Sequence, residues 1–445
     1  MLHEHIHDAL DALEERDGQS RLTPQDDQFD VLVSIIADET SISPDELRIS
    51  EQKFKDEVED ILEDISDSDD PISDFHSSLH KLKADVEDRY QEYTILFPWN
   101  FREKDAEGFT HPVEILGVEF RLTAKQVWDD YVEQASEEST FDKFLEEVPT
   151  KRHHESPFSH HRYWEAEVEA ADPQYAVNRV ETALKTLMGK ITYSAYFAST
   201  PNTFRSTTWK YGITELQAPV CYIVLEDSEY LHYYVSYDYR PRQTFKFRAG
   251  MGYAFEELYN ELPNFNGELS TIEEHLGTAL RAFQSGMSKP RPTQSFLEFW
   301  RALEAATLSQ EEEYSAAAPL ERSTAALLPE DRDLAEKRIE LLADKRNDLI
   351  HGGKEVEVTE GDRVYLKNLC EASIRFVANE RENHSFEELQ FLFEYGAKSD
   401  DNILQAQAER ERQITEKRGE IEGHEHDLKL LEKLEEMREN AESQE

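Results

Sequence analysis

One stretch, Lys337–Gly353, constrains the fold of this chain more than any other; its sequence is KRIELLADKRNDLIHGG. Four residues recur in it at helical spacing and so share one stripe of a helix: Ile339, Leu342, Arg346 and Ile350. A pair of glycines at the end of the stretch is typical of a helix C-terminus that turns left-handed. The pattern therefore predicts a packed helix that stops at the glycine pair and carries Arg346 on its apolar stripe.

Two polar residues lie beside this stripe. Asn347 and His351 are four residues apart, so they share the neighbouring face of the predicted helix. A cation, an amide and an imidazole at one helix end form a plausible phosphate-handling site. Two structural alternatives remain open, because an Arg on an apolar stripe also extends to water or pairs with a carboxylate, and a His at a helix end also acts as a cap.

Three ordered segments resemble a known family. Arg346–His351 (RNDLIH) resembles the R-x4-6-H motif of HEPN domains. Upstream, Phe296–Glu304 (FLEFWRALE) resembles the F-x-x-F-W-x-A-L-E helix of the ApeA-like HEPN subgroup, and Ala279–Phe283 (ALRAF) resembles the helix that opens this module. The trailing His351–Gly353 is also typical of the subgroup. The resemblance covers about residues 269–395, which is less than a third of the chain.

The resemblance implies a site and a reaction. HEPN domains commonly pair as dimers that bring two motifs to one cleft, and many members are metal-independent endoribonucleases. By this resemblance Arg346 would bind the scissile phosphate, and His351 would be the general acid or base that assists attack by the ribose 2′-OH. Asn347 would orient His351 or the phosphate, and Glu304 would position Arg346. The implied products are a 2′,3′-cyclic phosphate and a 5′-OH, with no cofactor and no metal.

Two functional hypotheses follow from the resemblance. In the first, the chain is an RNA-cutting effector of an antiviral defence or toxin-like system, with RNA and a second copy of the chain as partners. Residues 1–268 would then be a sensor or regulator that responds to an unidentified phage or protein trigger. In the alternative, the HEPN-like module is non-catalytic and binds RNA or a nucleotide, or scaffolds a partner. A purely structural helical protein would require all three segments to match by chance.

The charge balance limits the partners and the environment. The chain holds 96 Asp and Glu against 48 Lys and Arg, a formal net charge of −48. This excess is typical of a very salty cytoplasm, such as that of a haloarchaeon, where salt screens self-repulsion. A hydrophobic content of 38%, with 23 Phe and 19 Tyr, argues against disorder for most of the chain. A basic nucleic-acid-binding surface is not expected for the whole protein, so any RNA contact would be local.

Other sequence signals are mostly negative. The two cysteines, Cys221 and Cys370, lie far apart and give no disulfide framework. The sequence shows no N-terminal targeting pattern and no apolar run of about 18 residues, so we expect a cytoplasmic protein without membrane contact. Phosphate-loop, dinucleotide-binding, zinc-protease and nucleophile-elbow motifs are absent from the sequence.

The periodicities predict an α+β fold in four regions. Residues 1–90 form an acidic helical region with four apolar stripes, and residues 91–268 form an α+β domain of unknown role. Residues 269–395 form an all-α, HEPN-like bundle, and residues 396–445 form a charged helical tail.

Individual elements are also predicted. In the middle region we expect strands at Tyr93–Trp99 and Val113–Leu122, a helix over 172–200, and a β-hairpin within 219–239 that turns at 226–228. In the bundle we expect five helices, over about 269–283, 293–307, 331–351, 360–379 and 385–395.

Two further segments carry weaker functional signals. Residues 151–164, KRHHESPFSHHRYW, are interpreted as a loop with four histidines that form a weak metal-site candidate: His153, His154, His160 and His161. The same loop offers side chains that could hold a phosphate chain and stack a base, although a solvated loop is the alternative: Lys151, Arg152, Arg162, Tyr163 and Trp164. A Tyr- and Arg-rich stretch over 233–248 is either a ligand face or an ordinary strand edge.

Overall fold

The computed structural model describes most of the chain: residues 2–17, 24–101, 111–148, 158, 161–199, 216–236, 252–309, 317–327, 329–351, 356–396, 404–415, 417–418 and 429. It divides the chain into two compact units. The first comprises Met1–Ala306 with Val356–Asn379, and the second comprises Thr307–Glu355 with Glu380–Glu445. Within the described residues there are fifteen helices, counting one 3-10 turn, and one six-stranded sheet. The predicted α+β class is confirmed.

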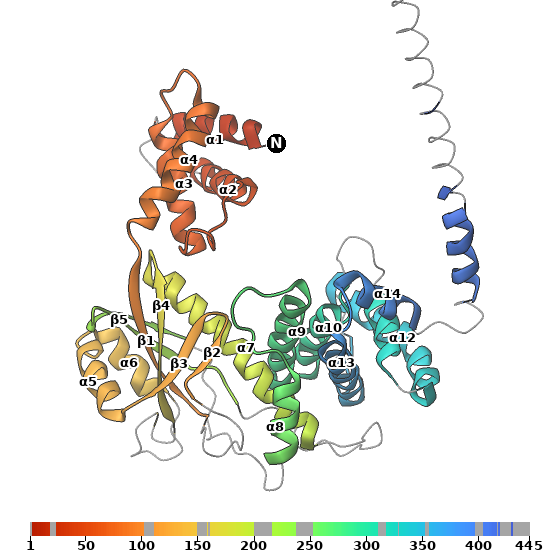
Figure 1. Ribbon diagram of the computed structural model, residues 1–445. Coiled ribbons are helices and arrows are strands. Elements are labelled where there is room, and N and C mark those ends of the chain that lie inside the picture. The colour runs from red at the N-terminus through yellow and green to blue at the C-terminus, as the bar shows by residue number, and fades with distance from the viewer. Residues whose placement is uncertain are drawn as a thin grey trace, which may run out of the picture. The chain divides into compact units, whose positions relative to one another are not determined.

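The acidic N-terminal region is helical, as its apolar stripes predict. It contains α1 (Leu2–Asp17), α2 (Pro24–Glu39), α3 (Glu51–Asp64) and α4 (Pro71–Glu87), which are red and orange in Figure 1. Their apolar faces meet in one core in which Ile6, Phe29 and Phe54 are almost fully buried. Caps fix the helix starts, since the Ser50 side chain accepts a hydrogen bond from the Lys53 N–H at the start of α3.

A single antiparallel sheet forms the middle of the chain. Its strands lie in the spatial order β2-β3-β4-β1-β5-β6. Their bounds are Gln91–Trp99 (β1), Val113–Ile115 (β2), Val118–Thr123 (β3), Arg162–Ala170 (β4), Cys221–Glu226 (β5) and Glu229–Val235 (β6). The predicted hairpin is confirmed: Asp227 and Ser228, both at positive φ, make the two-residue turn between β5 and β6. The predicted strand over 113–122 is interrupted at Gly117, where φ is +75°.

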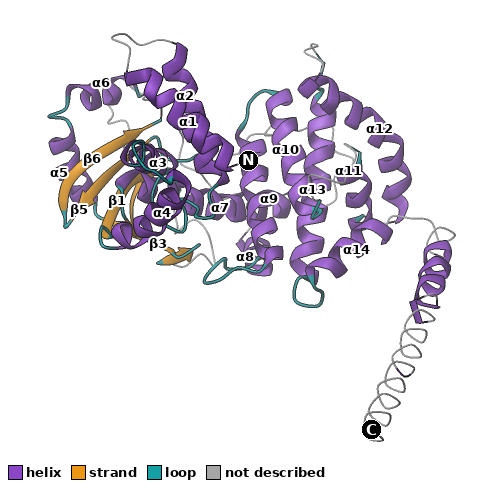
Figure 2. Cartoon of the chain, turned by 90° about the horizontal axis from the view of Figure 1, so that it is seen from above, coloured by secondary structure: helices purple, strands orange, loops and turns teal. Residues whose placement is uncertain are grey.

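Helices cover both faces of this sheet (Figure 2). On one face, α5 (Lys125–Ala135) and α6 (Ser139–Glu147) enclose a core that includes Trp128, Phe141 and the β1 residue Leu96. The long helix α7 (Pro173–Ser199), predicted from its apolar spacing, contacts β1 to β5. Side chains alternate along β1, so Phe97 points away from Leu96 and packs against Phe120 and Tyr222.

The structure corrects the interpretation of residues 151–164 as one loop. Arg162–Ala170 is strand β4, which pairs with both β1 and β3. Tyr163 and Trp164 are buried in the cores of the two sheet faces, and burial raises the pKa of Tyr163 to about 12. They are therefore not available to stack a base. The other segment residues named above, apart from His161 and Arg162, lie outside the described residues.

The helices of the predicted C-terminal bundle are divided between the two units. The first unit holds α8 (Gly252–Glu261), α9 (Thr271–Ser288), α10 (Pro292–Ala306) and nearly all of α13 (Glu360–Glu380). The second holds α11 (Ala318–Ser323), the 3-10 turn η2 (Thr324–Ala326), α12 (Pro329–His351) and α14 (Phe386–Gly396). Sequence analysis missed α6, α8 and α11, which are all short. In the tail, the described residues 404–415 are helical.

Helix α9 runs further than its sequence suggests. The predicted helix ends at about residue 283, whereas α9 continues to Ser288. A Cβ at Gly286 would lie 2.8 Å from the Phe299 ring, and the Ser295 hydroxyl donates to the Gly286 carbonyl at 2.6 Å. The glycine therefore allows α9 and α10 to approach closely rather than ending the helix.

A second close approach, at Gly189 of α7, gives a testable prediction. A Cβ at this position would lie 2.4 Å from the backbone carbonyl oxygen of Leu280 in α9, so Gly189→Ala forces the two helices apart. We expect a loss of about 1–3 kcal/mol or more in the free energy of unfolding. The control is Gly361→Ala in α13, whose new Cβ would meet nothing closer than the Thr359 hydroxyl at 3.6 Å. Equal melting temperatures for the two variants would contradict the packing described.

Two sequence predictions about the whole chain also have structural outcomes. Both cysteines, Cys221 and Cys370, are fully buried and take part in no disulfide. Among the described residues, no helix combines the length and the apolar character needed to cross a membrane.

Candidate functional site

The predicted site lies on α12, in the second compact unit. The middle turns of this helix carry a stripe of buried side chains at helical spacing: Ala335, Ile339, Leu342 and Ala343. This stripe includes two of the four predicted positions. Arg346 follows on the same stripe and is half-buried, so the guanidinium lies at the border between core and solvent.

The last turn of α12 is open to solvent. The side chain of Ile350, predicted to pack on the stripe, is 49% exposed, so this part of the prediction is wrong. The stripe periodicity continues to Ile350, but the packing does not reach the last turn of the helix. Asn347 and His351 are both exposed there. The glycine pair at 352 and 353 lies outside the described residues.

One hydrogen bond links two of the predicted site residues. Nη1 of Arg346 donates to Oδ1 of Asn347 at 3.4 Å, which holds the guanidinium beside the amide. His351 is the last residue of α12, four residues beyond Asn347 and on nearly the same face. The helix therefore presents a cation, an amide and an imidazole at its open end, as the sequence predicts.

The angular spacing of these groups limits what one copy can do. At 3.6 residues per turn, five residues correspond to about 500°, so Arg346 and His351 point about 140° apart round the helix axis. The same five residues separate them by about 7.5 Å along the axis. Arg346 and His351 of one helix therefore do not readily contact the same phosphodiester. A second copy of the helix end would place a His351 side chain on the same side as Arg346.

Comparison with known proteins adds no family. No family model, no curated protein and no solved structure matches the chain.

The fourth predicted site residue is Glu304. It belongs to α10 in the first unit, whereas Arg346, Asn347 and His351 belong to the second. Its side chain is half-buried, and Oε1 accepts a hydrogen bond from the indole Nε1 of Trp300 at 2.8 Å. This contact within α10 fixes the carboxylate on the aromatic stripe of that helix. The role of Glu304 in positioning Arg346 stays a prediction.

The weaker candidates give no further site within the described residues. His161 is the only one of the four loop histidines in that part of the chain, and it packs edge-on against Phe158. No group of three or more His, Cys, Asp or Glu side chains in the described residues is arranged to hold a metal ion. On β6, Tyr233 packs against Phe141 of α6, while residues 237–250 lie outside the described residues.

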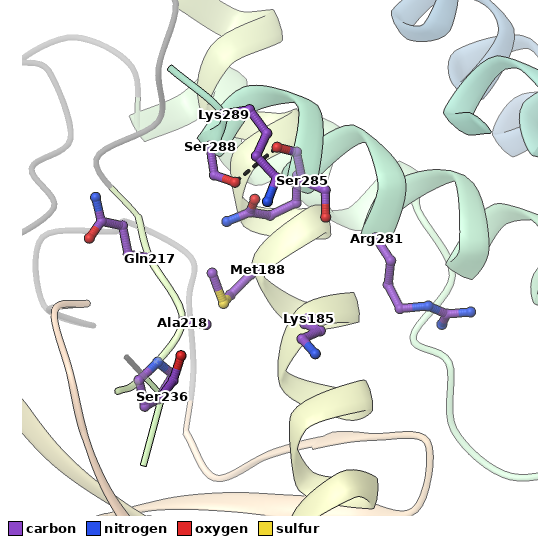
Figure 3. A pocket seen from close by; sticks show the side chains of 11 residues that line it. Lys185, Met188, Gln217, Ala218, Ser236, Arg281, Ser285, Ser288 and Lys289 are labelled. Carbon is purple, nitrogen blue, oxygen red and sulfur yellow. Dashed lines mark hydrogen bonds between the residues drawn. The ribbon is translucent and has the colours of Figure 1, made fainter. Parts of the chain in front are cut away.

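Sequence analysis missed a different cluster of basic side chains, in the first unit. One cavity is lined by Lys185 of α7, Arg281 of α9 and Lys289, the residue after α9, together with residues 217–219 and Ser236 (Figure 3). No local motif joins these positions. The only sequence signal is that acidic residues outnumber basic ones by 96 to 48 in this chain, so basic residues that face one cavity stand out once the fold is known.

Proposed function

We propose that the chain is a HEPN-type, metal-independent endoribonuclease that acts as a dimer, with its active site at the C-terminal end of α12. The observation that supports this proposal is the open end of that helix, where a half-buried Arg346, hydrogen-bonded to Asn347, precedes an exposed His351. These are the residue types that RNA transesterification needs, and the resemblance of RNDLIH to R-x4-6-H agrees with them.

The reaction needs a cation and a proton carrier. The ribose 2′-oxygen attacks phosphorus, a P–O2′ bond forms, and the P–O5′ bond breaks to give a 2′,3′-cyclic phosphate and a 5′-OH. Arg346 would stabilise the charge on the non-bridging oxygens through charge-assisted hydrogen bonds. His351 would take the 2′-OH proton or deliver a proton to the leaving 5′-oxygen. Asn347 would hold the guanidinium or the phosphate in place.

A dimer would allow Arg346 and His351 to reach the same phosphate. Because Arg346 and His351 diverge by about 140° on one helix, two facing copies would let Arg346 of one and His351 of the other approach the same phosphate. The exposed Ile350, between them in sequence, supplies apolar surface for such a contact. A cytoplasmic effector of antiviral defence or of a toxin-like system, with residues 1–268 as sensor or regulator, fits this assignment.

The alternative is a non-catalytic HEPN-like module that binds RNA or a nucleotide, or scaffolds a partner. It keeps the dimer and the half-buried Arg346, but it assigns no proton transfer to His351. The two functions differ in one measurable outcome, which is whether RNA is cut or only bound.

RNA cleavage by the full chain tests the proposal. Wild-type protein and Arg346→Ala are incubated with total RNA in concentrated KCl that contains EDTA, and the new RNA ends are identified. We expect 2′,3′-cyclic phosphate and 5′-OH ends from wild type and at least a 100-fold lower rate from Arg346→Ala, since one lost charge-stabilising donor typically costs 100- to 1,000-fold. Binding without any cleavage favours the non-catalytic alternative, and cleavage that needs a divalent metal contradicts the mechanism.

A further inference from the structure

A cavity of about 220 Å³ opens in the first unit, away from α12 (Figure 3). Its walls come from α7, from α9, from the segment that leads into β5 and from the residue after β6. The lining residues are Lys185, Met188, Gln217, Ala218, Pro219, Ser236, Arg281, Gln284, Ser285, Ser288 and Lys289. Four chain segments that are distant in sequence therefore converge on one hollow.

The charge of this lining is opposite in sign to the net charge of the chain. Three of the lining residues are basic, and none is Asp or Glu. In the whole chain, acidic residues outnumber basic ones by 96 to 48. A random sample of this chain would be negative, so a cavity whose only charged lining residues are basic departs from the composition of the chain. Such a concave positive site attracts anions.

The side-chain hydrogen bonds of Arg281 go to neutral acceptors. Its Nη1 donates to the Thr186 hydroxyl at 3.0 Å, and its Nη2 donates to the Thr278 hydroxyl at 2.9 Å. Both acceptors are neutral, and no carboxylate among the described residues forms an ion pair with this guanidinium. Burial lowers the pKa of Arg281, because removing a cation from water disfavours its charge. A bound anion would restore that lost stabilisation.

The two lysines differ in how they are held. Lys185 pairs with Glu181, one turn earlier on α7, at 2.9 Å, and both side chains keep contact with solvent. Lys289 follows α9 directly, its backbone N–H donates to the Ser285 carbonyl, and its side chain is half-buried. In Figure 3 the ammonium group of Lys289 turns back toward the Ser285 side of the helix. An anion in the cavity can therefore be met by one exposed, ion-paired ammonium group and by one half-buried lysine side chain.

Neutral groups complete a preorganised lining. The Gln284 amide donates to the Leu216 carbonyl at 3.1 Å, which ties α9 to the segment that enters β5. The Ser288 hydroxyl donates to the Ser285 backbone carbonyl at 2.9 Å, which fixes this hydroxyl at the end of α9. The Met188 side chain, which Figure 3 shows in the same hollow, gives part of the wall an apolar character. The lining thus combines fixed polar groups, cations and an apolar surface.

We propose that this cavity binds a small phosphorylated anion, in contact with Lys185, Arg281 and Lys289. Three cations suit a doubly or triply charged phosphate better than a carboxylate. The volume is many times the roughly 10–15 Å³ that one water needs, and it lies below the roughly 300–1,000 Å³ of drug-sized sites. Both comparisons favour a compact ligand over a polynucleotide chain. This inference does not depend on the nuclease proposal, because the cavity belongs to a different unit.

The test uses the full chain and inorganic pyrophosphate as the probe. Titration calorimetry at constant ionic strength compares wild type with the double variant Lys185→Gln/Lys289→Gln. We expect saturable binding of one pyrophosphate per chain by wild type and at least tenfold weaker binding by the double variant. The matched control, Lys81→Gln/Lys83→Gln, removes the same charge from exposed positions on α4 and should bind within twofold of wild type.

Two outcomes would overturn the assignment. One is the absence of saturable pyrophosphate binding to wild type, and the other is an equal loss of affinity in the double variant and its control. Circular dichroism confirms that each variant is folded. If the double variant is unfolded, the single variant Lys289→Gln replaces it, because this side chain lies beyond the end of α9. That variant should weaken binding by at least threefold, and unchanged binding would refute the site.

Discussion

Replacing His351 by alanine is expected to lower the rate of RNA cleavage by about 100- to 10,000-fold, which is the usual contribution of a positioned general acid or base. The imidazole is exposed at the last residue of α12, so its loss removes no packing. The free energy of unfolding should therefore change by less than about 0.5 kcal/mol, as for other surface substitutions. The expected signature is an enzyme that binds RNA and folds normally but does not cut.

The measurement is single-turnover cleavage of a labelled RNA in concentrated salt, with filter binding on the same samples. His80→Ala is the matched control, because His80 is also an exposed histidine on a helix, in α4 of the first unit. It should cleave at the wild-type rate. If His351→Ala cleaves RNA at the wild-type rate, the chain is a nuclease but another residue carries out the proton transfer.

A mixed dimer adds a test of the composite site. If Arg346 of one copy and His351 of the other act on one phosphate, mixing Arg346→Ala with His351→Ala protein leaves one intact site in each heterodimer. Activity should then return to a fraction of wild type, although each variant alone is inactive. A mixture that stays inactive would mean that both residues act from the same copy, which the 140° divergence on α12 makes difficult.

The secondary structure was largely predictable where one periodicity runs for more than ten residues. Helices such as α7 and α12 fulfil this condition, because their apolar stripes are long enough to exclude a strand. Strand β4 does not. Its sequence, RYWEAEVEA, alternates correctly but is rich in Glu and Ala, which are poor strand formers. Pairing with β1 on one side and β3 on the other stabilises it, and that tertiary contribution is invisible in a single sequence.

The candidate site was predictable in its residues but not in its exposure. Helical spacing places Ile350 on the same stripe as Ile339, yet Ile339 is buried and Ile350 is 49% exposed. Whether a stripe is covered depends on how far the neighbouring elements extend, and periodicity contains no information on that. The basic cavity was not predictable for a related reason, since its walls come from segments up to about a hundred residues apart.

The buried ion pair of α13 gives the largest expected effect on stability. Lys367 and Glu371 are one helical turn apart and hydrogen-bonded, and their side chains are 1% and 7% exposed. Removing one partner leaves an uncompensated charge in the core. We therefore expect Lys367→Met to lower the free energy of unfolding by about 3–5 kcal/mol. High salt should not rescue this variant, because mobile ions screen a buried pair far less than a surface pair.

The measurement is denaturant unfolding followed by tryptophan fluorescence, which reports on the first unit because all five tryptophans fall within Met1–Ala306. Lys125→Met breaks an exposed i,i+4 pair with Asp129 and should lower the free energy of unfolding by less than about 1 kcal/mol.

The double variant Lys367→Met/Glu371→Leu distinguishes the effect of the unpaired charge from the effect of altered packing. Apolar residues of similar volume often replace a buried pair without loss, so it should recover most of the stability that Lys367→Met loses. If it is as unstable as the single variant, then the shape of the lysine side chain, and not the stranded carboxylate, determines the cost.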